Sequence, residues 1–385
     1  MFLEKTIRRN RPLIEAGFQF HQTGAILPDS YLIDVDTFKE NARNIWNQAN
    51  SQNIKLYFML KQVGRNPYLA KELIKIGYEG AVVVDFREAM VMMKHHIPIS
   101  NVGHLVQPPQ HMLQILVDYG CEYFTVFSIE KIKAIHDCAK KAHKVQKLLL
   151  KVAGKDDIMY SGQHAGFQLE SLKAVVEEVK HLKYVEIQGV TSFPCFLYDE
   201  ITDGILPTSN FNTLQSAKAI LKECGITIEN VNAPSTTSIE TLKQMANYDI
   251  QSGEPGHGMS GSTPLHAKKD CVEIPAVIYV SEISHNFDHA AYCYGGGFYR
   301  RSHMKKALVG KSIDTAQIVA VDAPDLESID YYFGLSKTCS INDTVIMAFR
   351  FQIFVTRSNV VLIEGLSQHQ PVIIGSYTSL GEELT

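Results

Sequence analysis

Eight apolar runs of strand length alternate with amphipathic, helix-like stretches between residues 55 and 253. The expected strands are Lys55–Leu60, Gly80–Val84, Asn101–Leu105, Glu122–Phe127, Leu148–Val152, Val185–Val190, Ile228–Val231 and Tyr248–Gln251. The helix-like segments include Pro67–Ile76, Phe86–Lys94, Ile129–Ala142, Leu169–Leu182 and Leu214–Cys224. This alternation predicts a parallel sheet, and eight repeats favour a closed (β/α)8 TIM barrel over a doubly wound open sheet, which shares the pattern.

The pattern changes near residue 272. Later apolar runs are separated by turn residues and lack helical periodicity, which indicates a mainly β domain. These runs are Ile274–Val280, Gln317–Val321, Asp343–Ala348 and Val360–Ile363. We therefore expect a barrel domain over 1–271, including an N-terminal extension over 1–30, and a C-terminal β domain over 272–385. The segment Phe18–Gly24 fits against either domain, and Cys195–Phe211 is expected to be an insertion over the barrel mouth because it is long and rich in turn residues.

Composition excludes several classes of function. The 385 residues carry a formal charge of −4 that is spread along the chain, so neither nucleic acid nor an anionic membrane is an expected partner. The N-terminus lacks the apolar stretch of a signal peptide, and no apolar run approaches the roughly 18 residues of a membrane helix. Seven cysteines without CxxC spacing indicate free thiols in the cytoplasm rather than a disulfide framework or a zinc knuckle.

A lysine stands at the end of the first expected strand, where Phe58-Met59-Leu60-Lys61 leads into a glycine-containing turn. Desolvation penalises the charged form of a lysine behind a buried apolar run, and a lysine with a lowered pKa is a nucleophile toward an aldehyde. From position alone the simpler interpretation is a strand that ends at Lys61, with its ammonium group in water.

Segments around this lysine resemble alanine racemases and the related fold-type III pyridoxal-phosphate enzymes. The run from Leu32 to Asn41 is similar to their opening helix motif, a strand ending in lysine follows at the proper distance, and the run from Gly80 to Ala89 is similar to their second strand and helix. The resemblance covers roughly residues 30–260. Four further segments look closest to the YhfX-like group: Gly64–Pro67, Phe193–Cys195, Glu254–His257 and Tyr292–Gly297. The resemblance implies pyridoxal 5′-phosphate as cofactor and Lys61 as its Schiff-base lysine.

Two loops late in the barrel sequence are candidates for binding the cofactor phosphate. Asn232–Thr237 follows the seventh expected strand, and Gly253–Gly258 follows the eighth. TIM barrels often bind phosphate at these two loops, although each segment taken alone is an ordinary turn or helix cap. The residues that the resemblance implies for the phosphate are Ser235, Thr236, Gly256 and His257.

Glu254 has the largest consequence for the chemistry. Alanine racemases have an arginine at the matching position, whereas the related basic-amino-acid decarboxylases have Glu-Pro-Gly-Arg; this chain has Glu-Pro-Gly-His. The resemblance implies that Glu254 binds the pyridine nitrogen. A carboxylate there favours the protonated ring and makes it a deeper electron sink. The alternative is a solvated loop glutamate.

Three positions depart from the relatives. Ser192 lies nearest to the place where they commonly have a histidine, so no imidazole stacks on the ring from there. The stretch Phe349–Ile353 lacks the His-x-Cys pair of the zinc-dependent relatives, so we predict no catalytic metal. His164 stands where relatives often have a basic residue, and is either a cofactor contact or an ordinary histidine at a helix start.

Tyr294 is the best match to the catalytic tyrosine of the racemases, because it precedes a glycine in the run Tyr292-Cys293-Tyr294-Gly295; otherwise this is a glycine-rich turn. Nearby Arg300, Arg301 and His303 are either a site for a substrate carboxylate or a solvated basic patch. The resemblance predicts an amino-acid racemase or epimerase that forms a homodimer, with a decarboxylase, a lyase and a non-catalytic cofactor carrier as alternatives.

Overall fold

The computed structural model describes residues 2–325 and 327–384. By their packing, these residues form two compact units. Among the described residues, the first unit contains 2–43, 61–66, 257–325 and 327–384, and the second contains 44–60 and 67–256. We call them the β unit and the barrel unit. The domain boundary expected at residue 271 stays a prediction.

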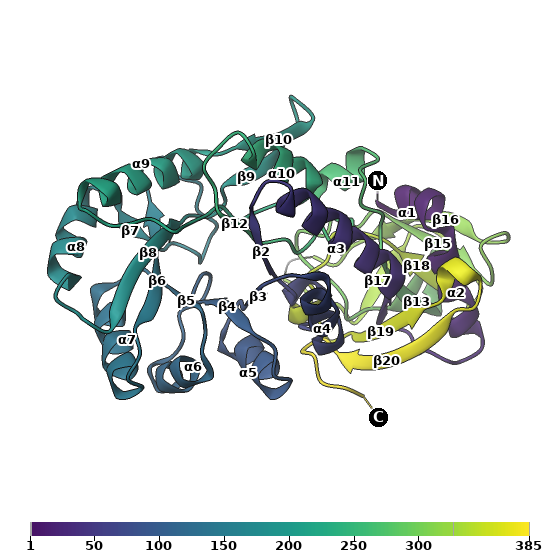
Figure 1. Ribbon diagram of the computed structural model, residues 1–385. Coiled ribbons are helices and arrows are strands. Elements are labelled where there is room, and N and C mark those ends of the chain that lie inside the picture. Colours follow the sequence, from purple (N-terminus) through teal and green to yellow (C-terminus); the bar gives the residue numbers. More distant parts are fainter. Residues whose placement is uncertain (1, 326, 385) are drawn as a thin grey trace. The chain divides into compact units, whose positions relative to one another are not determined.

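The barrel unit contains a closed sheet of parallel strands (Figure 1). Its strands are β2 (Lys55–Phe58), β3 (Gly80–Val82), β4 (Ile99–Val102), β5 (Tyr123–Val126), β6 (Gln146–Ala153), β8 (Val185–Thr191), β11 (Asn230–Asn232) and β12 (Ser252–Gly253). The order is β5-β4-β3-β2-β12-β11-β8-β6, and pairing of β5 with β6 closes the ring. The expected TIM barrel is confirmed. The eighth strand was expected at Tyr248–Gln251, which is wrong: it is a two-residue strand that begins at Ser252.

Helices follow most of these strands, as the sequence pattern predicts. They are α4 (Pro67–Ile76), α5 (Phe86–Lys94), α6 (Leu113–Tyr119), α7 (Ile129–Lys141), α8 (Leu172–Val179), α9 (Ser209–Glu223) and α10 (Ile239–Met245). Side chains that accept a backbone N–H fix several helix starts: Asp85 caps α5, Ser128 caps α7 and Ser238 caps α10. The helix expected over Leu169–Leu182 is shorter in the structure. Its first turn is the 3-10 helix η3 (Leu169–Ser171), and α8 ends at Val179.

The expected insertion contains a β-hairpin. Strands β9 (Phe196–Asp199) and β10 (Gly204–Pro207) pair antiparallel before α9 begins. The hairpin is tied to the loop after β11, because the Cys195 N–H donates to the Pro234 carbonyl and the Thr236 hydroxyl donates to the Phe196 carbonyl. It therefore lies beside the carboxyl end of the seventh barrel strand.

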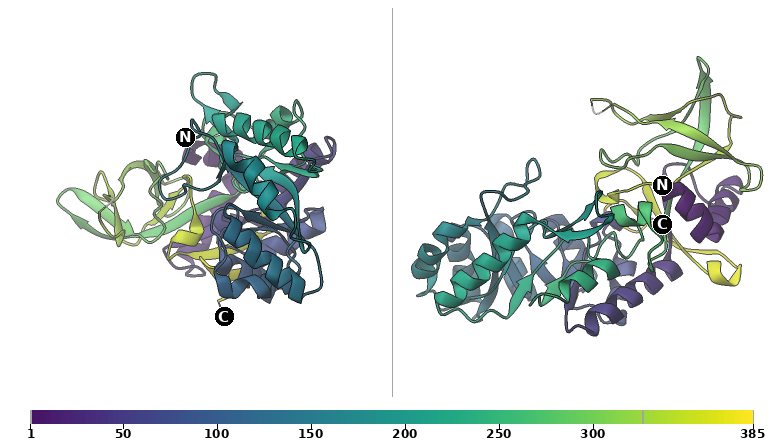
Figure 2. Two further views of the ribbon diagram at one scale, coloured as in Figure 1. Left: turned by 90° about the vertical axis from the view of Figure 1, so that its left-hand side faces the viewer. Right: turned by 90° about the horizontal axis from the view of Figure 1, so that it is seen from above.

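The β unit is built on a second sheet (Figure 2). Its strands are β1 (Ser30–Asp34), β13 (Val277–Phe287), β14 (Ala290–Tyr294), β15 (Lys306–Gly310), β16 (Gln317–Asp322), β17 (Tyr332–Leu335), β18 (Thr344–Met347), β19 (Asn359–Glu364) and β20 (Val372–Thr378). The order is β14-β17-β16-β15-β18-β13-β1-β19-β20. All neighbouring pairs are antiparallel except β1 with β19. The mainly β character expected after residue 272 is confirmed.

The N-terminal extension belongs to the β unit. It forms α1 (Phe2–Arg9) and α2 (Arg11–Gln22), and the helix α3 (Val35–Asn50) follows β1. Phe18 lies in a core with Ile278 of β13 and Ile346 of β18. A Cβ atom on Gly17 would lie 2.8 Å from Ile278 Cδ1, so the helix approaches the sheet where it has no side chain. The open question about Phe18–Gly24 is thus settled for Phe18, which packs on the β sheet.

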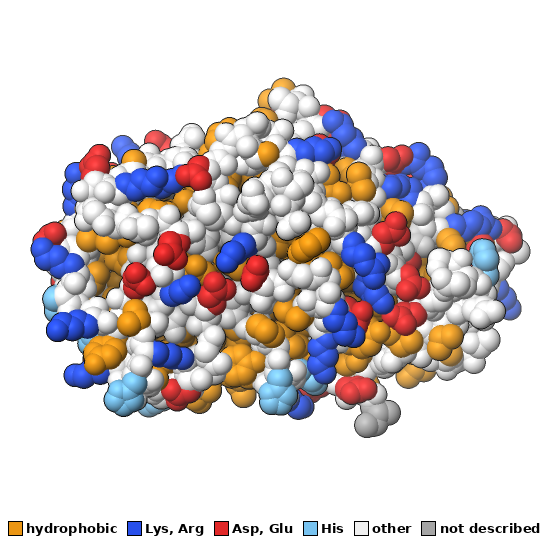
Figure 3. All heavy atoms as spheres, viewed as in Figure 1, with side chains coloured by type: hydrophobic (Ala, Val, Ile, Leu, Met, Phe, Trp, Pro, Cys, Tyr) orange, Lys and Arg blue, Asp and Glu red, His pale blue; other side chains and the backbone are white. Residues whose placement is uncertain are grey.

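The surface carries charges of both signs. On the face drawn in Figure 3, acidic and basic side chains are interspersed. None of the helices in residues 2–325 and 327–384 is long and apolar enough to cross a membrane.

Candidate active site

Polar side chains converge inside the barrel at the carboxyl ends of its strands, which is where TIM barrels place their sites. They come from the end of β4, from β6, from the ends of β8 and β11, and from the residue after β12. These side chains are His104, Lys151, Thr191, Asn232 and Glu254, and all are buried.

Glu254 is held in a fixed orientation. Its side chain is 2% exposed, its Oε1 accepts a 2.6 Å hydrogen bond from Nδ2 of Asn232, and its Oε2 lies 3.9 Å from Nε2 of His104. Its backbone N–H donates to the Thr237 hydroxyl, at 3.3 Å. The alternative of a solvated loop glutamate is therefore wrong. Burying a carboxylate is costly unless polar partners surround it, as they do here.

A chain of hydrogen bonds fixes Asn232 in turn. The Ser252 hydroxyl donates to Oδ1 of Asn232 at 3.1 Å, or to Oδ1 of Asn230 at 2.6 Å, and Asn230 donates to the Tyr57 hydroxyl. Nδ2 of Asn232 also lies 3.3 Å from Oγ1 of Thr191. The amide nitrogen of Asn232 faces Glu254, as a carboxylate that only accepts hydrogen bonds requires, and the amide oxygen faces the Ser252 hydroxyl.

Lys151 brings a buried amine to the same cluster. Burial lowers the pKa of Lys151 to about 8, while the negative charge of Glu254 acts to raise that pKa. Nζ of Lys151 lies 3.2 Å from the backbone carbonyl oxygen of His104 and 5.6 Å from the centre of the Phe127 ring. A lysine whose pKa is this low changes its charge near neutral pH.

The loop after β11 has an unusual backbone. Ser235 has φ 106° and Thr236 has φ 46°, and positive φ is uncommon for residues other than glycine, above all for a β-branched one. The hydrogen bond from Thr236 to Phe196 and a 2.5 Å hydrogen bond from the Thr241 hydroxyl to the Thr236 carbonyl hold this conformation. Such strained loops cluster at ligand sites, which fits the role expected for Ser235 and Thr236.

In the β unit, Lys61 begins the short 3-10 helix η1 (Lys61–Val63) and is partly buried. His257 belongs to the same unit. Burial holds the pKa of His257 well below its usual value, and the charges of Arg350 and Lys61 lower it further. The imidazole of His257 is therefore neutral at pH 7.

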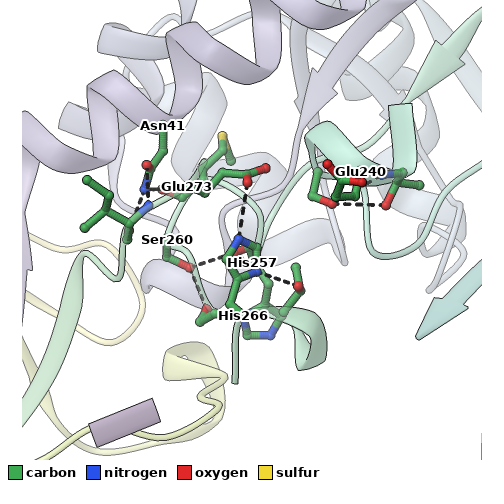
Figure 4. Close-up of polar contacts among 12 residues, drawn as sticks. Asn41, Glu240, His257, Ser260, His266 and Glu273 are labelled. Carbon is green, nitrogen blue, oxygen red and sulfur yellow. Dashed lines mark hydrogen bonds and ion pairs between the residues drawn. The ribbon is translucent and has the colours of Figure 1, made fainter. Parts of the chain in front are cut away.

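Both ring nitrogens of His257 have hydrogen-bond partners within the β unit, and Figure 4 shows the residue close to Ser260 and His266. Gln352 donates to Nε2 of the ring at 3.1 Å, so Nδ1 carries the proton and donates to the Ser262 hydroxyl at 2.8 Å. Ser260 lies beside this pair and donates to the His257 carbonyl. The imidazole thus anchors the turn, and only the backbone of His257 matches the phosphate role expected for it.

Tyr294 ends strand β14, and the residue is 37% exposed. Its carbonyl accepts a 2.7 Å hydrogen bond from Ser281, and its ring contacts that of Tyr332 at 5.9 Å between centroids. The next residues are packed against acidic groups: Gly296 lies against Asp29, and the Gly296 N–H donates to Asp330. Burial raises the pKa of Asp29 to about 6, against the effect of hydroxyls donated by Ser358 and Tyr279.

The other predicted residues fall into two groups. Ser192 and Gly256 are buried, and the Ser192 hydroxyl donates to the Val152 carbonyl at 3.0 Å. The exposed residues are His164, Arg300, Arg301 and His303. His164 lies in a loop before η3, so the alternative of a helix-start histidine is wrong, and its contact with the cofactor stays a prediction.

Four buried residues of the barrel cluster were not among the predicted site residues: His104, Lys151, Thr191 and Asn232. His104 and Lys151 fall inside segments that the sequence analysis assigned to apolar strands, and Asn232 ends the seventh strand. A charged residue within an apolar strand pattern was the available signal, since it must find a polar partner when buried. Among the residues that the structure describes, no group of three or more His, Cys, Asp or Glu side chains is arranged to hold a metal ion.

Comparison with known proteins decides the family. The model of the alanine racemase N-terminal domain matches residues 33–264, and that of the YhfX-like C-terminal domain matches residues 278–373. This chain belongs to the alanine racemase family, in its YhfX-like group. It is 42% identical to the uncharacterized protein YhfX of Escherichia coli K12, over the full length of both chains.

Solved structures of other proteins share the fold. Alanine racemase of Clostridium difficile 630 is similar with a TM-score of 0.64 and 16% identity, covering 92% of this chain and 99% of the other. Diaminopimelate decarboxylase of M. jannaschii is similar with a TM-score of 0.67 and 14% identity, covering 92% and 90%. The family is one of pyridoxal-phosphate-dependent enzymes, which confirms the expected cofactor.

The residues present fit pyridoxal phosphate. That cofactor is held by an amine for its aldehyde, a polar group for its ring nitrogen and donors for its phosphate. The chain provides Lys61, the oriented carboxylate of Glu254, and the hydroxyls and strained backbone of Ser235 and Thr236.

Proposed function

We propose that this chain is a pyridoxal-phosphate enzyme that acts at the α-carbon of an amino acid, as a racemase or epimerase. The buried Glu254 carboxylate, oriented by Asn232 at the carboxyl end of the barrel, supports chemistry at the α-carbon, and the similarity to alanine racemases ranks a racemase first. When bound, the cofactor supplies a conjugated ring that accepts the electron pair left when a bond to the α-carbon breaks. A carboxylate beside the ring nitrogen favours the protonated ring, and so the acceptance of those electrons.

In this proposal the chain's own residues have distinct roles. Lys61 holds the cofactor covalently and then moves the α-proton on one face of the substrate. Tyr294 gives or takes the proton on the other face. Ser235 and Thr236, with the backbone of Gly256 and His257, hold the phosphate, and Ser192 and His164 line the cofactor site.

Tyr294 acts from the partner subunit in this proposal, and the enzyme is a homodimer. Its partly exposed side chain at the end of β14 suits contact with another chain. An isologous two-fold dimer would complete two equal sites. The seven free cysteines are consistent with the cytoplasmic location that we propose.

A decarboxylase is the second candidate, and Glu254 is the observation that favours it. The glutamate resembles that of the basic-amino-acid decarboxylases rather than the arginine of the racemases, and a deep electron sink suits loss of carbon dioxide as well as loss of a proton. A lyase that expels a β-substituent uses the same sink. A non-catalytic carrier is disfavoured by the folded C-terminal β domain, which a carrier does not need.

One screen separates these functions. The purified, cofactor-loaded protein is incubated in D2O with single amino acids of both configurations, with Lys61→Ala as control. Deuterium at the α-carbon with loss of optical activity supports a racemase; carbon dioxide release indicates a decarboxylase, and an oxo acid with ammonia indicates a lyase. Wild-type protein that yields no product beyond the Lys61→Ala control with any amino acid would contradict the proposal and favour the carrier.

A further inference from the structure

His104 is buried beside Glu254 and has no role in the chemistry described above. Its side chain is 0% exposed and its Nε2 lies 3.9 Å from Oε2 of Glu254, whose side chain is 2% exposed. Asn232 binds the other carboxylate oxygen. The two oxygens of Glu254 therefore face two different polar side chains, one from the loop after β4 and one from β11.

Three contacts fix the position of His104 in the barrel. Lys151 Nζ lies 3.2 Å from its backbone carbonyl oxygen, which ties the loop after β4 to β6. Phe193 contacts the imidazole edge to face, with 5.8 Å between ring centroids and 88° between planes. The third contact is Glu254 itself. A rigid imidazole at this place limits how far the Glu254 carboxylate can turn. Neighbouring side chains commonly orient functional groups in this way.

The polar character of His104 matters as much as its shape. Burial disfavours an ionised carboxyl group, and the barrel unit offsets this with polar neighbours. Lys151 is the positively charged group of the cluster. The charge of Glu254 opposes the lowering of the Lys151 pKa by burial. An imidazole tolerates an adjacent carboxylate, whereas an apolar side chain of the same size would desolvate it further.

We propose that His104 is a positioning residue for Glu254, keeping that carboxylate ionised and aimed at the protonated ring nitrogen of the cofactor. The inference rests on the proposed function, since it assumes that Glu254 binds this nitrogen. His104 acts through Glu254 and not on the substrate.

The test measures the ring nitrogen directly. Wild-type protein and its variants are loaded with pyridoxal phosphate labelled with ¹⁵N in the ring, and the ¹⁵N chemical shift is followed against pH. His104→Phe keeps the size of an aromatic ring but has no ring nitrogen, His104→Gln keeps a polar group near Nε2, and Glu254→Gln is the reference. Thermal unfolding of each cofactor-free variant shows whether it is folded.

In the His104→Phe variant, we expect the ring nitrogen of the cofactor to lose its proton at a pH at least one unit lower than in wild type. The Glu254→Gln variant should shift in the same direction. His104→Gln should recover at least half of that shift. A general packing defect would not be rescued in this way. If the pKa of the cofactor's ring nitrogen is unchanged or raised in a folded His104→Phe variant, but clearly falls in Glu254→Gln, the role of His104 is overturned and the proposed function stands. An unchanged value in Glu254→Gln contradicts the proposed function itself.

Discussion

Asn232 donates a 2.6 Å hydrogen bond to Glu254, and both side chains are buried at the carboxyl end of the barrel. Asn232 is the last residue of β11, and Glu254 follows β12, which pairs with β11 through Asn232 and Ser252. A carboxylate fixed in this way presents its charge in one direction before any ligand arrives. Preorganised charge of this kind is more effective than charge that must reorient during a reaction.

Lys61 should be the lysine that binds the cofactor covalently. Borohydride reduction of the loaded protein followed by peptide mapping should find the pyridoxyl group on Lys61. Lys151 is the internal comparison, because it is buried and burial lowers its pKa to about 8. A label on Lys151 or on another lysine, with Lys61 unmodified, would contradict the assignment of Lys61.

Glu254→Gln should bind the cofactor but turn over slowly. The amide keeps the size of the side chain but has no negative charge to pair with a protonated ring. Loss of ~3 kcal/mol of transition-state stabilisation lowers kcat by about two powers of ten. Steady-state kinetics on whichever amino acid the screen identifies will measure this, with Glu200→Gln as a control at an exposed position. Wild-type kcat in Glu254→Gln would remove the electron-sink argument.

The pKa of Lys151 should fall further in Glu254→Gln. Burial lowers this pKa to about 8 and the charge of Glu254 acts in the opposite direction, so removing the charge leaves burial less opposed. The lysine then loses its proton at a lower pH than in wild type. An NMR titration of ¹³C-labelled lysine side chains in the cofactor-free protein, assigned with Lys151→Arg, measures the change. A rise in the pKa would show that Glu254 does not act on Lys151 as inferred.

Mixed subunits should reveal where Tyr294 acts. Lys61→Ala and Tyr294→Phe chains are each expected to be inactive, and a heterodimer of the two keeps one intact site if Tyr294 reaches the partner subunit. Equal mixing should restore about a quarter of the wild-type activity, because half of the dimers are mixed and each has one site. With subunit exchange verified by mass spectrometry, absence of complementation would place Tyr294 in its own subunit's site or outside catalysis.

Gly296→Ala should destabilise the protein more than Gly24→Ala. Both glycines have positive φ, 127° and 73°, so each substitution introduces backbone strain. A Cβ atom on Gly296 would lie 1.9 Å from Oδ2 of Asp29, whereas a Cβ atom on Gly24 meets nothing within 4 Å. We expect the free energy of unfolding to fall by about 1–3 kcal/mol more in Gly296→Ala, measured by urea denaturation. Equal losses would show that the Asp29 side chain simply moves away.

The sequence by itself determined the architecture. Strand and helix periodicity act over short stretches of chain, so the alternation between residues 55 and 253 predicted the barrel, and its loss after residue 272 predicted the β sheet. The helix bounds Pro67–Ile76 and Phe86–Lys94 agree with the structure. The short strand β12 was misplaced, because two residues carry too little pattern to locate a strand.

Only the tertiary structure decided which polar residues meet. Asn232 and His104 are far apart in the chain, and nothing in their neighbouring residues indicates that both face Glu254. Closure of the sheet brings the strand ends together, and burial then makes each polar atom depend on its neighbours. The same holds for β1: the run from Leu32 to Asn41 is similar in sequence to a helix motif, but its first residues belong to a strand that pairs with β13 and β19. Local pattern specifies the elements, whereas long-range pairing and desolvation specify the site.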